Sequence, residues 1–448
     1  MKTCISCLSV AMLVLAVVLL WTAPCGAEET TFSDLEKEIE VLSTRYIDPV
    51  SATALLKSFI EGACAELTAH KLPTKDLSYF PLTSTLKEDL KGIEKIIDET
   101  LPPGGSLPKA KLIEKGMEAV ASSLKDENTR FYLPGSYHVK ELPPARRGGI
   151  GLLIDESKDR EGAFVITETY TGLPAEKAGL RTGDRIVEVD ARDVKPLERH
   201  QLGELVSGEV GTPLILTVKQ GAELRKVTLE RVAMGTTDSV IYKPLAEKIG
   251  YLKFKLFNEG LEQATLDIVN TLRDTKMEGL IVDLRNNGGI PDAAISLTGL
   301  FIPKEDTIAT QVFRNSKKIY VPKIATSYSL PTVVLVNEYS ASASTLMAEA
   351  FRSSLKARIV GMPTEWRYSA TSRLELKSGA TLVFTTSYYI LSNGKAVRGK
   401  GEGVKPGILV PQEPRDTSAL DQEKDEQLKR AVELLQEALK SKTPMPPQ

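Results

Sequence analysis

Residues 333–344 read Val-Val-Leu-Val-Asn-Glu-Tyr-Ser-Ala-Ser-Ala-Ser, an apolar run that passes directly into a turn of small residues. The continuous apolar run is typical of a strand that is buried on both faces of a sheet. The residues that follow predict a helix over 342–355. A serine at this turn faces the positive end of the helix, where the first N–H groups have no partner within the helix. That position suits a nucleophile beside an oxyanion hole. It also suits a plain helix N-cap, which is the more frequent role of a serine at a helix start.

A second buried strand, residues 280–284, ends in Arg285-Asn286-Asn287-Gly288-Gly289. Taken alone, the Gly-Gly pair indicates only a turn. Around these two segments, strands and helices alternate from residue 234 to 412, which predicts a sheet with helices packed over it. The other predicted elements are a strand over 250–257, helices over 261–272 and 293–301, a hairpin of 374–376 with 381–390, and a charged helix over 420–439 in the C-terminal segment 413–448.

Residues 141–233 have a different pattern, in which short alternating runs separated by glycines predict a small β-rich module. Within it, residues 174–190 form a short helix that ends at a glycine, followed by a Gly-Asp turn that starts a strand. This stretch resembles the signature of PDZ domains, which bind peptide C-termini as an added strand. In that comparison Gly149-Ile150-Gly151-Leu152 forms the carboxylate-binding loop, whose N–H groups converge on an anion. A degenerate module used only as a spacer is the alternative.

Residues 28–140 are predicted to be mainly helical, because their apolar residues recur at steps of three and four. The sequence Pro102-Pro103-Gly104-Gly105 breaks this region, and a further helix is predicted over 111–124. The fold class is therefore multi-domain α/β, with a helical N-terminal region, a β-rich module, an α/β core and a C-terminal helix.

The first 27 residues indicate a signal peptide. Lys2 precedes an apolar run over 10–21, and the small residues Cys25-Gly26-Ala27 predict cleavage before Glu28. An uncleaved membrane anchor is the alternative, although the apolar stretch is short for a membrane span. Both interpretations export the rest of the chain, to the periplasm or the cell envelope.

The composition excludes several classes of function. The 448 residues suggest three domains at about 150 residues each. With 57 basic and 59 acidic residues, the net charge of -2 offers no basic excess for nucleic acid. Cys64 is the only cysteine beyond the leader and is predicted to be a small core residue. Because His70, His138 and His200 lack the spacing of metal ligands, we predict neither a metal nor another cofactor.

Together, the two strand-and-turn segments behind a PDZ-like module resemble the carboxyl-terminal processing (tail-specific) serine peptidases, over roughly residues 30–440. The resemblance implies a hydrolase that cleaves near the C-termini of polypeptides. It implies that Ser342, the middle serine of the Ser-Ala-Ser-Ala-Ser run, is the nucleophile. It also implies an oxyanion hole formed by the N–H of Ala343 and one N–H of the Gly288-Gly289 segment.

The same resemblance places the base 25 residues after the serine, where the family has a lysine within Gly-x-x-Thr-x-Gly-Lys-Gly and a glutamine four residues further on. Here residues 361–371 read Gly-Met-Pro-Thr-Glu-Trp-Arg-Tyr-Ser-Ala-Thr. Arg367 therefore occupies the base position and Thr371 the glutamine position, while Trp366 and Tyr368 replace small residues. A shift in alignment brings no lysine to the base position, because none lies between 356 and 377.

An arginine cannot replace the lysine as a base. Burial can lower the pKa of a lysine to about 5–6, which makes a neutral amine available. A guanidinium, with a pKa of about 12.5–13.8, holds an anion but does not accept the proton of a serine. No spacing in the sequence supports a substitute base, such as His200 or Glu365.

Two functions follow from these observations. The first is a serine endopeptidase that acts on the C-terminal tails of exported proteins. The second is a pseudopeptidase that binds such tails without cutting them, or that regulates an active relative. Polypeptide C-termini are the expected partners in both, and the helical N-terminal region and the C-terminal helix are candidate surfaces for a homo-oligomer or an adaptor protein.

Overall fold

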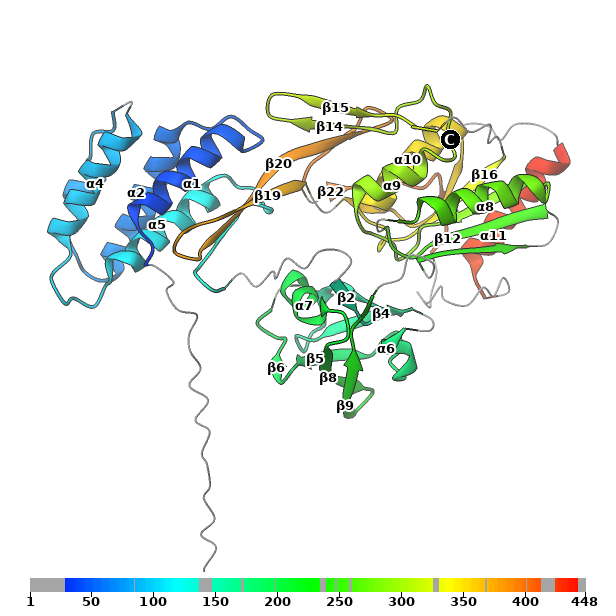
Figure 1. Cartoon of the computed structure of the whole chain (residues 1–448), viewed down its shortest axis with the longest axis horizontal. Helices are drawn as coiled ribbons and strands as arrows, with labels where there is room; N and C mark the ends of the chain where they lie inside the picture. Colours follow the sequence, from blue (N-terminus) through cyan, green and yellow to red (C-terminus); the bar gives the residue numbers. More distant parts are fainter. Residues whose placement is uncertain are drawn as a thin grey trace, which may run out of the picture.

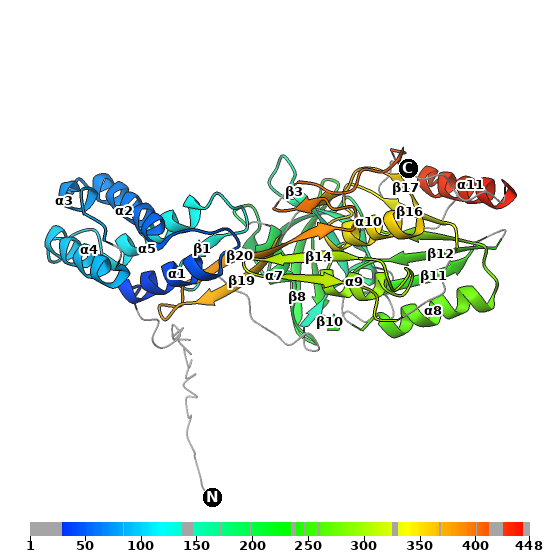
Figure 2. The same cartoon turned by 90° about the horizontal axis from the view of Figure 1, so that it is seen from above.

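The computed structural model describes residues 29–83, 85–136, 147–170, 173–197, 199–233, 239–245, 248–257, 260–324, 330–366, 369–399, 401–411 and 424–441. The predicted leader lies outside these residues. Figure 1 shows a helical N-terminal region, a separate β-rich module and an α/β core, so the predicted fold class is confirmed. In the view from above, the helical region and the core lie at opposite ends of the long axis (Figure 2). Among the described residues, no helix combines the length and apolar character that crossing a membrane requires.

The core is built on a six-stranded sheet in the order β11-β12-β13-β16-β17-β23. β11 pairs antiparallel with β12, and every other neighbouring pair is parallel. All residues of β13 and β16 are buried, as the apolar runs in the sequence predict. The strands are β11 (Val240–Pro244), β12 (Ile249–Phe254), β13 (Gly279–Asp283), β16 (Thr332–Val336), β17 (Arg358–Gly361) and β23 (Ile408–Leu409).

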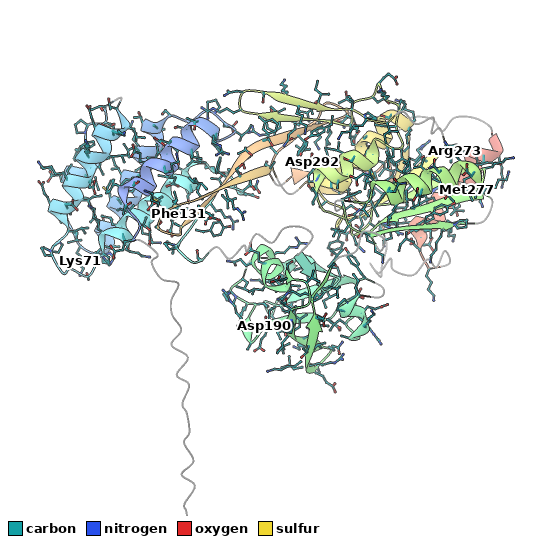
Figure 3. All side chains as sticks on the ribbon, viewed as in Figure 1. Lys71, Phe131, Asp190, Arg273, Met277 and Asp292 are labelled. Carbon is teal, nitrogen blue, oxygen red and sulfur yellow. The ribbon has the colours of Figure 1, made fainter. Side chains whose placement is uncertain are left out.

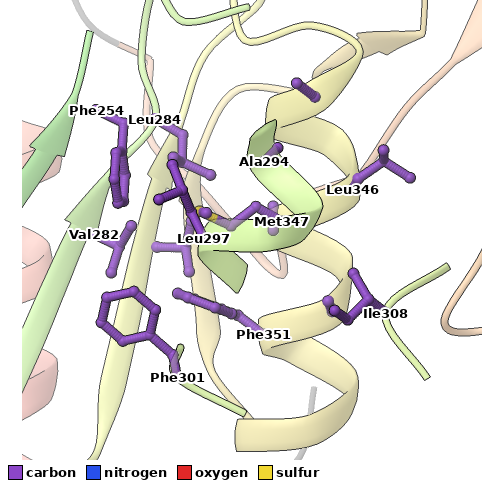
Figure 4. Close-up of a cluster of buried hydrophobic side chains, with 14 of the residues drawn as sticks. Phe254, Val282, Leu284, Ala294, Leu297, Phe301, Ile308, Leu346, Met347 and Phe351 are labelled. Carbon is purple, nitrogen blue, oxygen red and sulfur yellow. The ribbon is translucent and has the colours of Figure 1, made fainter. Parts of the chain in front are cut away.

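Helices cover both faces of this sheet, and alternate strand residues contact them. Phe254 and Val282 pack in the cluster that includes residues of α9 and α10 (Figure 4), and Val334 belongs to the same cluster. Tyr251 and Ile281 point the other way, into a smaller cluster with α11. The helices are α8 (Glu262–Asp274), α9 (Pro291–Thr298), α10 (Ala343–Leu355) and α11 (Glu426–Ser441).

The observed bounds correct three sequence predictions. The helix predicted over 293–301 begins earlier, at Pro291, because proline suits the first turn of a helix. The strand predicted over 250–257 ends at Phe254, and Phe257 makes only an isolated bridge to Gly289. The C-terminal helix begins at Glu426 and runs to Ser441, shifted from the predicted 420–439.

A second sheet connects the core to the helical region through one long strand, β20 (Thr381–Leu391). One end of β20 contributes Tyr389 and Leu391 to the core cluster, and the other contributes Leu382 and Phe384 to the helical cluster. Figure 1 shows β19 and β20 running from the core to the helices. The partners of β20 are β1 (Arg130–Tyr132), β14 (Ala309–Phe313), β19 (Ala370–Glu375) and β21 (Ala396–Val397), with β15 (Lys317–Tyr320) beside β14.

The helical region packs α2 closely against α5. A Cβ atom at Gly62 would lie 2.4 Å from the Cβ of Ala119, and one at Gly116 would lie 2.3 Å from the ring of Phe59, so glycine permits this approach. Cys64, predicted to be a core residue, is only partly buried and packs against the outside of the same cluster. Phe131 of β1 lies where this region meets the long hairpin of β19 and β20 (Figure 3). The helices are α1 (Phe32–Arg45), α2 (Ala52–Ala69), α3 (Lys75–Ser78), α4 (Leu86–Thr100) and α5 (Lys109–Ser123).

The β-rich module has a main sheet in the order β3-β4-β5-β8-β9, in which β3 is an edge strand. Asp190 lies in the turn after β5 (Figure 3). The strands are β2 (Arg147–Gly149), β3 (Leu152–Lys158), β4 (Phe164–Thr169), β5 (Arg185–Val189), β6 (Arg192–Asp193), β7 (Gly208–Glu209), β8 (Pro213–Gln220), β9 (Glu223–Glu230) and β10 (Val232–Ala233); the helices are α6 (Pro174–Lys177) and α7 (Arg199–Val206).

Glu38 places an ionisable group inside the helical region. Its side chain is fully buried, and neither carboxylate oxygen has a hydrogen-bond partner among the described residues. Helical periodicity puts it on the side of α1 that carries Asp34 and Arg45. Asp34 accepts a hydrogen bond from the N–H of Lys377 in the β19–β20 turn, and Arg45 lies over the Phe384 ring of β20. Glu38 therefore faces the long hairpin, and its burial raises the pKa of the carboxyl group well above 4.5.

We expect Glu38→Gln to raise the unfolding temperature at pH 8 and to change it little at pH 4. Because the folded-state pKa is raised, the protonated group stabilises the fold below its unfolded-state pKa, and this stability is lost as the pH rises towards the folded-state pKa. Glutamine does not ionise, so the variant avoids the loss. Calorimetry at both pH values tests this, with Glu40→Gln, an exposed position on α1, as the control. A Glu38→Gln effect independent of pH would contradict the expectation.

Candidate active site

The site lies at one edge of the core sheet. Because β12, β13 and β16 are parallel, their carboxyl ends meet there. The loops that leave these ends carry Phe257, the Gly288-Gly289 segment and Ser342, in that order across the sheet. Ligand sites of open α/β sheets lie outside the carboxyl ends of the strands, so this edge is the expected place for chemistry.

Ser342 immediately precedes α10 and has a strained backbone. Its φ of 49° and ψ of -101° lie where residues with a side chain are rarely found. Ser342 is the N-cap residue of α10, but its hydroxyl makes no capping hydrogen bond to the helix. The residue is 9% exposed, and within the described part of the chain its hydroxyl oxygen has no hydrogen-bond partner. The hydroxyl is therefore not held by the helix, and its role as a nucleophile stays a prediction.

Three backbone N–H groups near this serine are also unpaired. Across the described residues, no backbone hydrogen bond is donated by the N–H of Gly288, Gly289 or Ala343. These are the groups predicted to form the oxyanion hole. The N–H of Ala343 also belongs to the first turn of α10, where the helix dipole favours negative charge. The arrangement can stabilise charge that develops on a carbonyl oxygen near Ser342.

Hydrogen bonds hold the two loops of the site together. The carbonyl of Asn287 accepts from the N–H of Ala341 and from the hydroxyl of Ser344, at 2.9 Å each. The hydroxyl of Ser340 donates to the carbonyl of Leu284 at 2.8 Å. These bonds leave little freedom for the turn that carries Ser342. The sequence analysis did not find them, because serine and asparagine in a turn do not indicate which loop they contact.

A reciprocal pair of amides adds to this connection. The N–H of Asn286 donates to the Asn337 side-chain oxygen at 3.0 Å, and the Asn337 side-chain nitrogen donates to the Asn286 side-chain oxygen at 2.7 Å. Asn286 has a positive φ of 57°, which asparagine tolerates better than most residues. The pair fixes the start of both loops at buried positions.

Gly289 is required by a close approach of the backbone. Its φ is 118°, and an added Cβ would lie 2.3 Å from the carbonyl oxygen of Phe257. The N–H of Phe257 donates to the carbonyl of Gly288, and the N–H of Ile290 donates to the carbonyl of Phe257. Gly288, in contrast, has no neighbour within 4 Å of an added Cβ. The two glycines therefore have different structural roles.

The segment that carries the predicted base begins at the adjacent strand, β17. Thr364 is buried, and its hydroxyl lies 3.1 Å from that of Thr345 in the first turn of α10. This contact brings the chain towards the helix that begins after Ser342. β18 (Glu365–Trp366) then pairs with β22 (Gly401–Glu402). Arg367 and Tyr368 lie outside the described residues, so the role of Arg367 stays a prediction.

Thr371, predicted at the orienting position, lies in β19. Its side chain is exposed and its backbone pairs with Thr385 of β20. Among the described residues, no hydrogen bond joins Thr371 to Ser342. Its role in orienting a base stays a prediction as well.

The predicted carboxylate-binding loop lies before the edge strand β3. The carbonyls of Ile150 and Gly151 accept from the N–H groups of Ala175 and Tyr170, while the N–H groups of Ile150 and Gly151 donate no hydrogen bond within the described chain. Gly151 has a φ of 76°. Unpaired N–H groups beside an edge strand are the arrangement that captures a peptide C-terminus.

The β-rich module contacts the active-site edge directly. The Tyr339 hydroxyl, in the turn before Ser342, lies 3.4 Å from the carboxylate of Asp155 in β3. The Tyr170 hydroxyl donates to the carbonyl of Lys255, which follows β12, at 3.1 Å. A peptide bound along β3 would therefore lie near the serine.

A strained serine between a buried parallel strand and a helix, flanked by unpaired N–H groups, is the arrangement expected of a serine hydrolase with an α/β core. Residues 248–410 match the family model of Peptidase family S41, and residues 165–220 match that of the PDZ domain. The chain therefore contains a Peptidase family S41 domain and a PDZ domain, and the curated relatives that it resembles over most of its length are named as carboxyl-terminal processing proteases.

Curated relatives cover most of the chain. The carboxy-terminal processing protease CtpA of Bacillus subtilis is 27% identical over 388 residues, which are 84% of this chain and 78% of that protein. The carboxyl-terminal-processing protease of Picosynechococcus sp. is 28% identical over 334 residues, 72% of this chain and 79% of that protein. Among solved structures, a photosystem II D1 C-terminal processing protease has a TM-score of 0.56 at 22% identity, covering 86% of this chain and 95% of that chain, which shows a shared fold.

We expect Gly289→Ala to lower the free energy of unfolding by about 1–3 kcal/mol from backbone strain, and by more where the new Cβ meets the carbonyl of Phe257. Gly288→Ala is the matched control, because open space surrounds that position. Urea denaturation of both variants measures the difference. An equal decrease in the free energy of unfolding for the two variants would contradict the close approach at Gly289.

Proposed function

We propose that this chain is a serine peptidase that binds the carboxyl-terminal tails of exported polypeptides and cleaves near them at a strongly reduced rate. The strained, unpaired Ser342 beside unpaired N–H groups supports the nucleophilic part of this function. The arginine at residue 367 supports the reduced rate. The leader predicted over residues 1–27 supports an exported protein of the periplasm or cell envelope, anchored to the membrane if the leader is retained.

Binding starts at the β-rich module. The tail adds as a strand to β3, and its carboxylate accepts hydrogen bonds from the N–H groups of Ile150 and Gly151. Because β3 carries Asp155, which contacts Tyr339, the bound polypeptide is delivered near the turn that holds the serine. Capture of a free C-terminus therefore explains specificity for tails.

Cleavage then follows the course of acyl transfer. The Ser342 oxygen attacks the scissile carbonyl carbon, its proton passes to a base, and the carbonyl oxygen becomes an oxyanion. The N–H of Ala343 and one N–H of the Gly288-Gly289 segment donate to this oxyanion. The C–N bond breaks as the amine takes a proton, and water later hydrolyses the acyl-enzyme.

The proton acceptor limits this sequence. At pH 7 about one guanidinium in a million is neutral, so an arginine cannot take the proton of the serine. Water or hydroxide must take it instead, and general base catalysis commonly contributes about 10²–10⁴-fold to such a step. Thus Ser342 and the unpaired N–H groups predict binding and slow hydrolysis.

The same arginine favours a second candidate, a pseudopeptidase. Its permanent positive charge, at the position that the resemblance assigns to the base, can hold a peptide carboxylate without any turnover. A chain of this kind would shield bound tails, or regulate an active relative within an assembly. The two candidates differ only in whether Ser342 is acylated.

We expect Arg367→Lys to increase hydrolysis of an unfolded substrate with an apolar tail by at least about tenfold, because a buried lysine can lose its proton near neutral pH. Cleavage by purified residues 28–448 is followed by mass spectrometry. Ser342→Ala in the same background must abolish the gain, and Arg373→Lys on β19 is the matched control.

The outcomes separate the candidates. Wild-type cleavage that disappears in Ser342→Ala supports the slow peptidase, whereas retained tail binding without any cleavage supports the pseudopeptidase. Wild-type activity that is fast and unchanged by Arg367→Lys would contradict both, since it would require another base.

We also expect tail binding to require the free carboxylate. Amidation of the C-terminus of a tail peptide removes its charge and should weaken binding about tenfold or more, because charge-assisted hydrogen bonds to the N–H groups of Ile150 and Gly151 are lost. Calorimetric titration of the acid and amide forms measures this. Equal affinities would indicate that the module is a spacer.

A further inference from the structure

Arg285 is the largest of the fully buried side chains, and the sequence analysis assigned it no role. It follows β13 and begins the loop that ends in Gly288 and Gly289. A buried guanidinium requires paired charges and satisfied hydrogen bonds. Its partners therefore show what determines the position of this loop.

Asp283 holds one side of the guanidinium. Its carboxylate accepts from Arg285 Nε at 3.0 Å and from Arg285 Nη2 at 2.7 Å. It also accepts from the hydroxyl of Tyr251 and from the backbone N–H of Arg285. These bonds connect Arg285 to the same strand and to its neighbour, β12.

Asp425 holds the other side. Its two carboxylate oxygens accept from Nη1 and Nη2 of Arg285, at 2.8 Å each. Gln427 accepts a further bond from Nη1 at 3.2 Å. This paired geometry fixes both the distance and the plane of the guanidinium. Asp425 is separated from Arg285 by 140 residues, so only the tertiary fold brings them together.

Asp425 is also the N-cap of the C-terminal helix α11. Its side chain accepts from the N–H of Leu428 at 2.8 Å, and its carbonyl accepts from the N–H of Lys429. Leu428 packs between α11 and the core sheet. One carboxylate thus begins the helix and binds the residue that begins the oxyanion loop.

The charges of this cluster support one another. Burial alone would raise the pKa of Asp283, but the charges of Arg285 and Lys253 and the hydrogen bonds outweigh it, so the pKa of Asp283 is lowered. The adjacent carboxylates raise the pKa of Arg285 against the effect of burial. Arg285 remains charged, and loss of one carboxylate leaves that charge without half of its bidentate partners.

The loop beyond Arg285 transmits this constraint to the serine. Asn286 is bonded to Asn337, and the carbonyl of Asn287 accepts from Ala341 and Ser344 on either side of Ser342. The Gly288-Gly289 segment follows directly. A displacement of Arg285 must therefore alter either these bonds or the placement of the glycine N–H groups.

We propose that Asp425 is a positioning residue for the oxyanion hole, acting through Arg285 on the loop that carries Gly288 and Gly289. The C-terminal helix is then part of the active site as well as a cover for the sheet. This inference rests on the proposed function for its catalytic meaning, whereas the structural coupling itself can be tested separately.

Asp425→Asn in residues 28–448 is the informative variant, because asparagine is a good N-cap and α11 keeps its cap while the charge is lost. Asp425→Glu restores the charge, and Glu433→Gln, on the exposed part of α11, is the matched control. Hydrogen exchange of the segment 286–289 measures the opening of the loop through the hydrogen-bonded amides of Asn286 and Asn287, and residues 343–355 and 426–441 are the internal controls for α10 and α11.

The oxyanion hole is measured with an acetylated apolar peptide that ends in alaninal, compared with the matched alaninol. Ser342 adds across the aldehyde: its oxygen bonds to carbon, the carbonyl π pair moves to oxygen, and the serine proton goes to that oxygen. The ratio of aldehyde affinity to alcohol affinity therefore measures how strongly the adduct is stabilised. The ratio in Ser342→Ala, which cannot form the adduct, is the baseline.

We expect Asp425→Asn to speed exchange of residues 286–289 and to lower the affinity ratio by about tenfold or more, with alcohol affinity unchanged and with recovery in Asp425→Glu. Unchanged exchange of residues 286–289 in Asp425→Asn, with α11 still protected, would overturn the inference. A third outcome separates the two proposals. If residues 286–289 exchange faster in Asp425→Asn but the wild type binds the aldehyde no more tightly than the alcohol, the coupling is supported and the proposed serine chemistry is rejected.

Discussion

The parallel pairing of β13 with β16 is the constraint on which the site depends, because it brings the ends of two separate βα units to one edge of the sheet. Loops that leave buried strands must satisfy their polar groups without water. Here each loop satisfies the other: Asn286 with Asn337, and the carbonyl of Asn287 with Ala341 and Ser344. Among the described residues, the polar groups of these loops that stay unpaired include the serine hydroxyl, the N–H groups beside it and both polar atoms of the buried Asn287 side chain. The reactive features of the site are thus among the groups that remain after the loops have bonded to one another.

Sequence patterns predicted those parts of the site whose structure depends on residues that are close together in the chain. The apolar run 333–336 predicted a buried strand, and the small residues after it predicted the turn and helix on which Ser342 lies. The strands β14 and β15 were not predicted, because mostly exposed residues such as those of β15 show no alternation between a buried and an exposed face. Arg285 and Asp425 could not be paired from the sequence, since 140 residues separate them and neither lies in a recognisable motif.

The long hairpin connects the segment with the base position to the helical region. β19 begins at Ala370, soon after Arg367 in the sequence, and its partner β20 begins inside the helical cluster through Leu382 and Phe384. Further bonds hold this junction: the N–H of Ile47 donates to the carbonyl of Thr385, and Arg398 pairs with Asp48. Because strands transmit displacement along their length, a shift of the helices would displace the backbone near residue 370. The buried Glu38 lies on the α1 side that faces this hairpin, so its protonation affects the same junction.

The strained serine and the unpaired N–H groups do not by themselves distinguish an enzyme from a binding protein. A turn from a buried strand into a helix requires small residues for close packing, and it leaves N–H groups of the first helical turn unpaired in any case. The strain at Ser342 costs on the order of 1–3 kcal/mol, which the bonds between the two loops can offset without reference to catalysis. The discriminating element is the proton acceptor, because acyl transfer cannot proceed at a useful rate while the serine keeps its proton. The proposed chemistry therefore depends on the residue predicted at the base position, Arg367, whereas the geometry around Ser342 follows from the described fold.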